Sequence, residues 1–261
     1  MEKTESDKIR FGLIGKNISY SFSRGYFTKK FSEMGLERHS YENFDFDQID
    51  QFKGLLEQNS NIKGFNVTIP YKEQIMPFLS KIDPEAQAIG AVNTIKIIGQ
   101  QTIGFNTDAY GFQKSIEPHL RGHHKKALIL GTGGASKAVA FVLNKLGISY
   151  KFVSRNPKDG QLNYTDLNKE VLTGHTVIVN CTPLGTYPNI NDKPDLPYNF
   201  ITDQHLLFDL IYNPEKTAFL LAGEQQGGKI SNGSNMLQFQ AEKSWEIWNS
   251  KHEELLGPSK P

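Results

Sequence analysis

The spacing of apolar residues alternates along the first part of the chain between that of a buried strand and that of a helix. Phe11–Gly15 is a short apolar run ending in glycine, which is typical of a buried strand. Phe27, Phe31 and Met34 then recur at i, i+4 and i+7, positions that share one face of a helix. We therefore predict alternating strands and helices over residues 1–105. The elements expected there are strands at Phe11–Gly15, His39–Phe46 and Ile62–Val67, helices within 21–36, around Phe52 and from Pro84 after Asp83, and a hairpin of Val92–Ile98 with Thr102–Phe105.

A more regular alternation begins after the polar segment 118–126. Strands are expected at Ala127–Leu130, Tyr150–Val153, Thr176–Cys181 and Leu206–Tyr212, and helices at Ser136–Leu146, Asp166–Leu172, Glu215–Gln226 and Ser234–Trp248. Strands that alternate with helices usually pair in parallel through right-handed connections. The chain is therefore expected to have an α/β fold whose second part is a doubly wound, Rossmann-like sheet.

Composition and charge narrow the function classes. The 261 residues carry a net charge of +1, from 29 Lys+Arg and 28 Asp+Glu, without the excess of positive charge that nucleic-acid binding requires. The single cysteine, Cys181, excludes an intramolecular disulfide and a multi-cysteine zinc site. The polar segment Met1–Arg10 does not resemble a signal peptide, and no apolar run is long enough to cross a membrane. We expect a cytoplasmic protein, a monomer or a homodimer, whose partner is a small molecule. The seven histidines show no metal-ligand spacing, so no metal is expected.

A glycine-rich segment, GTGGASKA at residues 131–138, follows the strand predicted at Ala127–Leu130 and opens the next helix. Glycine permits a tight turn and a close approach to a pyrophosphate, which the N–H groups of a helix N-terminus bind. The pattern predicts dinucleotide binding, and a plain strand–turn–helix without a ligand is the alternative. The residues expected to bind the pyrophosphate are Gly131, Gly133, Gly134 and Ala135.

The end of the next strand indicates which dinucleotide binds. NAD enzymes usually carry an acidic residue there, about 20 residues after the glycines, that binds the ribose 2′-hydroxyl. This chain has Ser154 and Arg155 instead, and the first acid to follow is Asp159. Arg155, with Lys158, can neutralise a 2′-phosphate while Ser154 donates a hydrogen bond. The sequence therefore favours NADP over NAD, and a solvated surface arginine is the alternative.

Two polar segments of the first half combine unusual residue types with a position next to a helix. Ser21 and Ser23 precede a helix, where their hydroxyls can cap the helix or hold a carboxylate. Lys72 ends the segment NVTIPYK and falls in the first turn of the next helix, where the helix dipole disfavours a positive charge by roughly 0.3–1 kcal/mol. That misfit indicates a catalytic role, although most lysines are simply solvated.

Two further polar segments, AVNT at 91–94 and GFNTD at 104–108, follow in the chain. Residues 106–108 can cap a helix that starts near Tyr110. Alternatively, Asp108 is a catalytic carboxylate paired with Lys72.

With these segments and the glycine loop in this order, the chain resembles the shikimate dehydrogenase family, NADP-dependent enzymes of aromatic amino-acid biosynthesis. The resemblance extends from about Phe11 to Trp248. The matching motifs are YSFS (20–23), NVTIPYK (66–72), AVNT (91–94), GFNTDAYG (104–111), GTGGASKA (131–138), NCTPLG (180–185), DLIYNP (209–214) and NGSNMLQFQ (232–240).

The resemblance implies a role for individual residues. Ser21 and Ser23 would bind the substrate carboxylate, and Lys72 with Asp108 would handle the proton. The other implied substrate contacts are Thr68, Asn93, Tyr212 and Gln240, and the implied contacts on the nicotinamide side are Thr182 and Gly233. The chain departs from the usual family pattern at Tyr20, Arg24, Ser154, Thr186 and Asn235.

The resemblance also implies the architecture and the reaction. Residues 1–107 with 233–261 would form the substrate-binding domain and residues 108–232 the NADP-binding domain. The reaction would be the reversible reduction of 3-dehydroshikimate to shikimate by NADPH, on the path to chorismate. The alternatives are a quinate/shikimate dehydrogenase that uses NAD or either cofactor, a folate-type dehydrogenase of similar build, and a non-catalytic nucleotide sensor.

Overall fold

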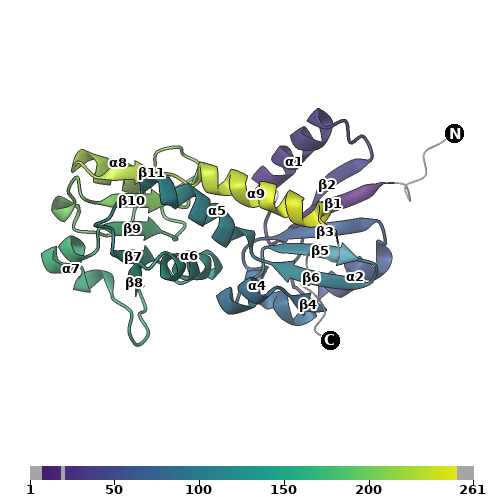
Figure 1. The fold of residues 1–261 in the computed structure, drawn as a ribbon, viewed down its shortest axis with the longest axis horizontal. Helices are drawn as coiled ribbons and strands as arrows, with labels where there is room; N and C mark the ends of the chain where they lie inside the picture. Colours follow the sequence, from purple (N-terminus) through teal and green to yellow (C-terminus); the bar gives the residue numbers. More distant parts are fainter. Residues whose placement is uncertain (1–7, 19–20, 252–261) are drawn as a thin grey trace. The chain divides into compact units, whose positions relative to one another are not determined.

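Two separate β-sheets organise the chain, and a different part of the sequence builds each of them (Figure 1). The structure is a computed structural model that describes residues 8–18 and 21–251. It divides into a first unit, residues 1–107 with 241–261, and a second unit, residues 108–240. The roles assigned above to the two predicted domains stay predictions.

The first unit holds a mixed six-stranded sheet in the order β2-β1-β3-β5-β6-β4. Its strands are β1 (Ile9–Gly15), β2 (His39–Asp45), β3 (Ile62–Val67), β4 (Lys81–Ile82), β5 (Thr94–Ile98) and β6 (Gln101–Phe105). Its helices include α1 (Phe22–Glu33), α2 (Gln51–Gln58), α3 (Tyr71–Gln74) and α4 (Pro84–Ile89). Because β1 pairs in parallel with both β2 and β3, the carboxyl ends of these strands share one edge, after which α1 and α3 begin.

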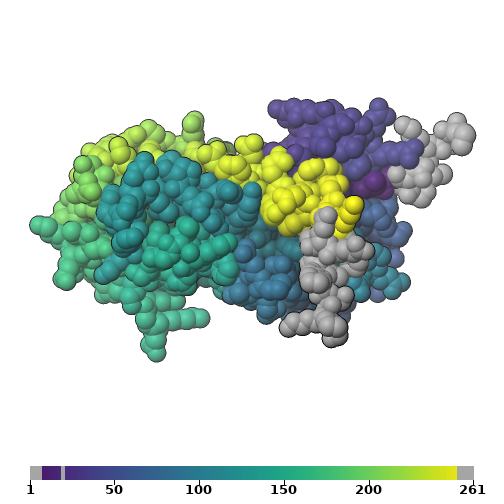
Figure 2. All heavy atoms as spheres, viewed as in Figure 1, coloured from purple at the N-terminus to yellow at the C-terminus, as the bar shows by residue number. Residues whose placement is uncertain are grey.

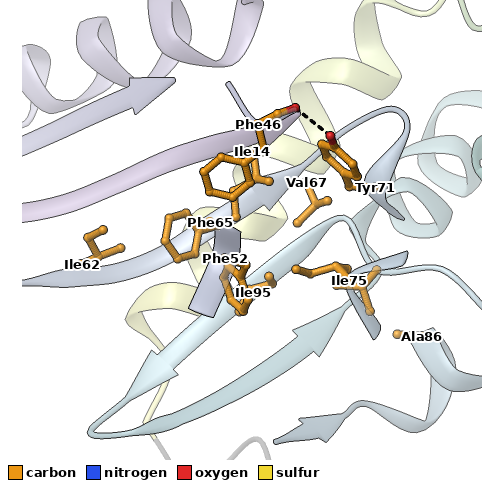
Figure 3. Close-up of a cluster of buried hydrophobic side chains, with 11 residues drawn as sticks. Ile14, Phe46, Phe52, Ile62, Phe65, Val67, Tyr71, Ile75, Ala86 and Ile95 are labelled. Atoms are coloured by element: carbon orange, nitrogen blue, oxygen red, sulfur yellow. Dashed lines mark hydrogen bonds between the residues drawn. The ribbon is translucent and has the colours of Figure 1, made fainter. Parts of the chain in front are cut away.

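An apolar cluster holds α3 against this sheet. Phe52 and Phe65 are fully buried in the cluster, and burial of such a side chain contributes roughly 1.5–3 kcal/mol. Tyr71, the first residue of α3, is also buried and donates a hydrogen bond to the carbonyl oxygen of Phe46 at 2.6 Å (Figure 3). The short helix is therefore anchored at the residue that precedes Lys72.

The second unit holds a five-stranded parallel sheet in the order β11-β10-β9-β7-β8. Its strands are β7 (Lys126–Leu130), β8 (Ser149–Val153), β9 (Val177–Asn180), β10 (Leu206–Asp209) and β11 (Lys229–Ser231). Its helices include α6 (Gly134–Lys145), α7 (Lys169–Gly174) and α8 (Ala218–Gln225). Every residue of β9 and β10 is buried, as expected for parallel strands with both faces covered.

Two helices contain the boundary between the units, α5 (Thr107–Ile116) and α9 (Ser234–Asn249). One side of α9 reaches the molecular surface, where its atoms form a yellow strip in Figure 2. Its other side is buried and includes Ala241, Ser244 and Trp248. Trp248 stacks on Phe11 with ring centroids 4.6 Å apart and donates a hydrogen bond from Nε1 to the Ile95 carbonyl at 3.0 Å. The last turns of α9 are therefore part of the first unit's core.

The predicted α/β fold is confirmed, with differences at element ends. The helix expected near Tyr110 begins at Thr107, and the helix expected from Asp166 begins at Lys169. The latter starts late because the Asn168 side chain caps it, accepting the Val171 N–H at 3.0 Å. The strands β4 and β11 were not predicted, because each has at most three residues and exists by pairing with a longer strand.

Candidate active site

Lys72 lies in α3, directly after the carboxyl end of β3. The helix has only four residues, so the helix dipole that was predicted to disfavour the Lys72 charge comes from a single turn. The side chain is half-buried, and the Lys72 carbonyl accepts the Val92 N–H at 2.7 Å. Thr68 lies at the same sheet edge, half-buried, with its N–H bonded to the Ile14 carbonyl at 2.9 Å. The first unit thus brings Lys72 and Thr68 to one end of the parallel strands.

Asn93 precedes β5 and is buried, with 2 % of its surface exposed. Its Oδ1 accepts the backbone N–H of Thr107 at 2.7 Å, and its Nδ2 donates to the Thr107 hydroxyl at 3.0 Å. Asn93 thereby binds the first N–H of α5, although it lies 14 residues before Thr107. This contact explains why α5 begins at Thr107, earlier than the sequence indicated.

The serine pair begins α1 in the first unit. Ser21 is the N-cap of α1, and its hydroxyl accepts the Arg24 N–H at 3.3 Å. Ser23 is half-buried and lies near Tyr41, a buried residue of β2, closely enough to offset part of the rise in the Tyr41 pKa that burial causes. Burial raises the pKa of Tyr41. The capping role of Ser21 is present, the carboxylate role of the pair stays a prediction, and Tyr20 lies outside the described residues.

Asp108 and Gln240 belong to the second unit and lie on two helices that touch. Asp108 is in the first turn of α5 and is buried, with 6 % of its surface exposed. A Cβ at Gly111, one turn later, would lie 2.6 Å from the Met236 carbonyl oxygen and 3.1 Å from the Gln240 Cβ, so α5 and α9 are packed backbone to backbone. Gln240 is buried and donates from Nε2 to the Leu237 carbonyl at 2.9 Å.

Tyr212 also belongs to the second unit, in the segment after β10, and is half-buried. Lys72 and Asp108 fall in different units, so their pairing stays a prediction.

The glycine loop follows β7 in the second unit. Gly131 has a φ of +98°, which a glycine adopts without strain, and its N–H donates to the Val153 carbonyl at 2.9 Å. A Cβ there would lie 3.1 Å from Cγ2 of Thr182, so the segments after β7 and β9 are in contact. The strand order reverses between β7 and β9, and ligands of such sheets bind outside the carboxyl ends at this point.

The start of α6 leaves backbone groups for an anion. Gly133 is the N-cap and offers no side-chain cap, and Gly134 begins the helix. The Ser136 hydroxyl donates to the Gly133 carbonyl at 2.7 Å rather than accepting from the first-turn N–H groups. The geometry fits the predicted pyrophosphate loop of Gly131, Gly133, Gly134 and Ala135.

The residues expected to select NADP follow β8. The Ser154 hydroxyl accepts the Asn156 N–H at 3.2 Å and so turns the chain. Residues 155–160, with Arg155, are all exposed, and this segment protrudes beyond β8 in Figure 1. Asp159 is therefore exposed within the protruding segment rather than at the strand end. The Arg155 guanidinium is open to an anionic ligand.

A buried hydrogen-bond network of the second unit, which the sequence reasoning did not assign, supports Thr182. Asn180 accepts the Thr182 hydroxyl at 2.7 Å and donates from Nδ2 to Oδ1 of Asp209 at 3.0 Å. Asp209 also accepts the Thr217 hydroxyl at 2.6 Å. Burial raises the pKa of the Asp209 carboxyl to about 6, against the lowering effect of these hydrogen bonds. The signal in the sequence was a polar residue at the end of each buried strand.

Gly233 is required by packing in the second unit. A side chain there would collide with the Leu210 carbonyl, and the Gly233 N–H bonds the Ile211 carbonyl at 3.0 Å. Among the described residues, no group of three or more His, Cys, Asp or Glu side chains could hold a metal ion. No helix in residues 8–18 and 21–251 has the length and apolar character needed to cross a membrane.

Three kinds of comparison place the chain among known proteins. The family model described as the shikimate dehydrogenase substrate binding domain matches residues 13–95. A shikimate dehydrogenase (NADP+) of Methanococcus vannielii is 34% identical over 266 residues, covering 94% of this chain and 92% of that protein. One of Clostridium botulinum is 38% identical, covering 91% of this chain and 95% of that protein.

A solved structure agrees with the sequence relatives. The crystal structure of shikimate 5-dehydrogenase from Thermus thermophilus, in complex with NADP(H) and shikimate, has a TM-score of 0.81 and 30% identity. The alignment covers 92% of this chain and 93% of that chain. Since relatives at 34% and 38% identity align over nine-tenths of the sequence, this chain belongs to the shikimate dehydrogenase family.

Proposed function

We propose that this chain catalyses the reversible, NADP-dependent reduction of 3-dehydroshikimate to shikimate. The observation that carries the proposal is the second unit's glycine loop at the strand-order reversal, followed by an exposed Arg155 where an NAD enzyme would have an acid. The relatives' names, and the NADP(H) and shikimate bound in the Thermus thermophilus structure, support the same substrate and cofactor.

The residues of the second unit fit NADP. The N–H groups at the start of α6 would hold the pyrophosphate, and Arg155 with Ser154 would hold the 2′-phosphate. Thr182 and Gly233 would contact the nicotinamide side. When bound, the reduced cofactor supplies the hydride, so the protein has to orient the substrate and move one proton.

The proton is assigned to Lys72. As the ring ketone is reduced, negative charge develops on its oxygen, which the Lys72 ammonium stabilises and then protonates from Nζ. In the oxidation direction, neutral Nζ takes the proton of the hydroxyl. Asp108 is assigned to act with Lys72 in this proton transfer. Ser21 and Ser23 bind the substrate carboxylate, and Thr68, Asn93, Tyr212 and Gln240 contact the rest of the substrate.

Initial rates with shikimate or quinate, each with NADP+ or NAD+, test the reaction. We expect turnover with shikimate and NADP+, and a clear preference for quinate or for NAD+ would contradict the proposal. Lys72→Ala should lower kcat by about 10² or more, the usual scale for loss of an acid–base group. Lys63→Ala, which removes an exposed lysine of β3, is the matched control and should leave kcat unchanged. Turnover of Lys72→Ala at the wild-type rate would refute the role of Lys72.

We also infer that the enzyme works in the cytoplasm as a monomer or a homodimer. Light scattering coupled to size-exclusion chromatography decides between the two states, and a larger assembly would contradict the inference.

A further inference from the structure

A group of buried polar side chains lies in the first unit, next to several residues of the proposed substrate site. We call it the hydroxyl network. Its members come from strands β2, β3 and β5, from the segment before β5, and from helices α5 and α9: Tyr41, Asn66, Asn93, Thr94, Thr107 and Ser244. Each of these residues exposes 5 % of its surface or less, and Thr94 and Ser244 expose none. Burying so many polar groups is unfavourable unless each finds a partner.

Ser244 occupies the centre of the hydroxyl network. Its Oγ accepts a hydrogen bond from Nδ2 of Asn66 at 2.9 Å. The same oxygen lies 2.8 Å from the Thr94 hydroxyl and 3.2 Å from the Thr107 hydroxyl. Thr94 and Thr107 are in turn 3.2 Å apart, so three hydroxyls from β5, α5 and α9 form a closed triangle.

The network fixes how two asparagine amides are turned. The Thr107 N–H is purely a donor, so the Asn93 atom that it meets at 2.7 Å must be the oxygen, and the Asn93 nitrogen points to the Thr107 hydroxyl. The backbone carbonyl oxygen of Asn93 is purely an acceptor, so the Asn66 side-chain atom 3.4 Å from it must be the nitrogen. The oxygen of Asn66 then accepts the Tyr41 hydroxyl at 2.8 Å. Hydroxyls can rotate to match these requirements, whereas the amides have one orientation each.

The ends of the network lie next to residues of the proposed site. Tyr41 lies near Ser23, one of the two serines proposed to bind the substrate carboxylate, and Ser23 offsets part of the rise in the Tyr41 pKa that burial causes. Thr107 is the residue before Asp108 in α5, and Ser244 lies four residues after Gln240 in α9. Asn93 is itself a proposed substrate contact. A change at the centre would therefore reach several substrate contacts through hydrogen bonds and helix backbone.

We propose that Ser244 is a positioning residue for the substrate, acting through Thr94, Thr107 and Asn66 on the amide of Asn93 and on the start of α5. The proposal rests on the proposed function, because it takes Asn93, Ser23 and Asp108 as substrate-site residues. Ser244 exposes none of its surface, so it would act on the substrate through its neighbours. Its hydroxyl accepts and donates inside the network, so that the amide nitrogen of Asn93 and the first turn of α5 keep one arrangement.

Ser244→Ala is the first test, read out as a split between Michaelis constants. Removal of the central hydroxyl leaves Asn66 Nδ2 and two threonine hydroxyls short of a buried partner, a loss that corresponds to about a tenfold effect on binding. We expect KM for shikimate to rise about tenfold, KM for NADP+ to stay within about twofold, and kcat to change less than KM for shikimate. Ser115→Ala is the matched control, because Ser115 is also a buried helical serine and its hydroxyl donates to the Gly111 carbonyl of its own helix at 2.8 Å.

Thr94 provides a second pair of variants that separates the hydroxyl from packing. Thr94→Val keeps the side-chain shape and removes the hydroxyl, whereas Thr94→Ser keeps the hydroxyl and removes a buried methyl group. We expect Thr94→Val to raise KM for shikimate as Ser244→Ala does, and Thr94→Ser to retain the wild-type KM although its thermal midpoint falls. If Ser244→Ala does not fold, this pair decides alone.

Three results would overturn the proposal: an unchanged KM for shikimate in folded Ser244→Ala and Thr94→Val, an equal rise in both Michaelis constants, or a Thr94→Ser variant as impaired as Thr94→Val. The Lys72→Ala variant distinguishes a failure of the positioning role from a failure of the proposed function. An inactive Lys72→Ala beside an unaffected Ser244→Ala refutes the positioning role alone, whereas a fully active Lys72→Ala refutes the assigned site.

Discussion

Asp209 offers a direct test of the buried electrostatics of the second unit, through the substitution Asp209→Asn. Oδ1 of Asp209 accepts from Asn180 at 3.0 Å and from the Ile211 N–H at 3.1 Å, so an amide oxygen has to take that place. The amide nitrogen then replaces Oδ2 and donates to the Thr217 hydroxyl. A protonated carboxyl would donate to Thr217 in the same way, so Asp209→Asn mimics the neutral form of Asp209.

The pKa of Asp209 sets the size of the effect. Burial raises that pKa from 3.8 to about 6, so the folded protein binds the proton more tightly than the unfolded chain. The stability that this carboxyl contributes is fully present below pH 3.8 and is lost as the pH rises through about 6. Each pKa unit corresponds to about 1.4 kcal/mol, so the whole loss approaches about 3 kcal/mol. Asp209→Asn has no such loss, and its stability relative to wild type should grow by about 2 to 3 kcal/mol between pH 4 and pH 7.

Urea unfolding followed by far-UV circular dichroism at pH 4, 5, 6 and 7 measures this difference for both proteins. Asp203→Asn is the matched control, because Asp203 is an exposed carboxylate shortly before the same strand, where solvent screens the charge. A free-energy difference between Asp209→Asn and wild type that is the same at every pH would refute the reasoning. A difference that shrinks as the pH rises would show that the ionised carboxylate is the form stabilised by its hydrogen bonds.

Two further substitutions test the cofactor side and the helix contact. Arg155→Ala should raise KM for NADP+ about tenfold or more and leave KM for NAD+ unchanged, because it removes a charge-assisted contact to the 2′-phosphate. Equal effects on both cofactors in steady-state rates would argue against that role. Arg121→Ala, which removes another exposed arginine, is the control. Gly111→Ala should raise KM for shikimate and lower stability by about 1–3 kcal/mol, since the new Cβ meets the Met236 carbonyl oxygen at 2.6 Å. Gly54→Ala, in α2 with open space at the Cβ, should be neutral or stabilising, and a Gly111→Ala variant with the same thermal midpoint and KM as Gly54→Ala would refute the close contact.

The sequence pattern predicted the strands and helices whose formation depends mainly on their own residues. Ile62–Val67 was predicted as a strand with the bounds that β3 has, and its apolar residues Ile62, Phe65 and Val67 are all buried. The helix from Pro84 was predicted from its cap, and Asp83 does accept the Glu85 N–H at 2.9 Å. By contrast, β4 consists of Lys81–Ile82 and forms because β6 offers it a partner, which no local pattern shows.

The candidate site likewise has one part that the sequence pattern predicted and one part that it did not. The glycine loop was visible from the sequence because the strand, the turn and the helix are consecutive, and the structure shows the positive φ of Gly131 that the pattern required. The hydroxyl network was not visible, since Asn66 and Ser244 are 178 residues apart in the chain. One signal was present: in the helix predicted at Ser234–Trp248, the spacing places Ser244 on one face with Ala241 and Trp248. A hydroxyl on such a face needs a buried partner, and a search for other polar residues in buried strands would have led to Asn66.

Each unit thus carries a buried polar network directly behind its proposed ligand residues. In the first unit, Ser244 and Thr94 lie behind Asn93, and in the second, Asn180 and Asp209 lie behind Thr182. Loop residues have few apolar contacts to hold their side chains, so hydrogen bonds with fixed donor and acceptor roles are an effective way to fix their orientation. Because a half-satisfied buried network is less stable than an apolar core, each network tolerates only substitutions that leave its donors and acceptors with partners. Asp209→Asn keeps the acceptor for Asn180 and Ile211 and reverses only the bond to the Thr217 hydroxyl, which can rotate, whereas Thr94→Val removes a hydroxyl. The first variant should therefore gain stability at neutral pH, and the second should lose substrate binding.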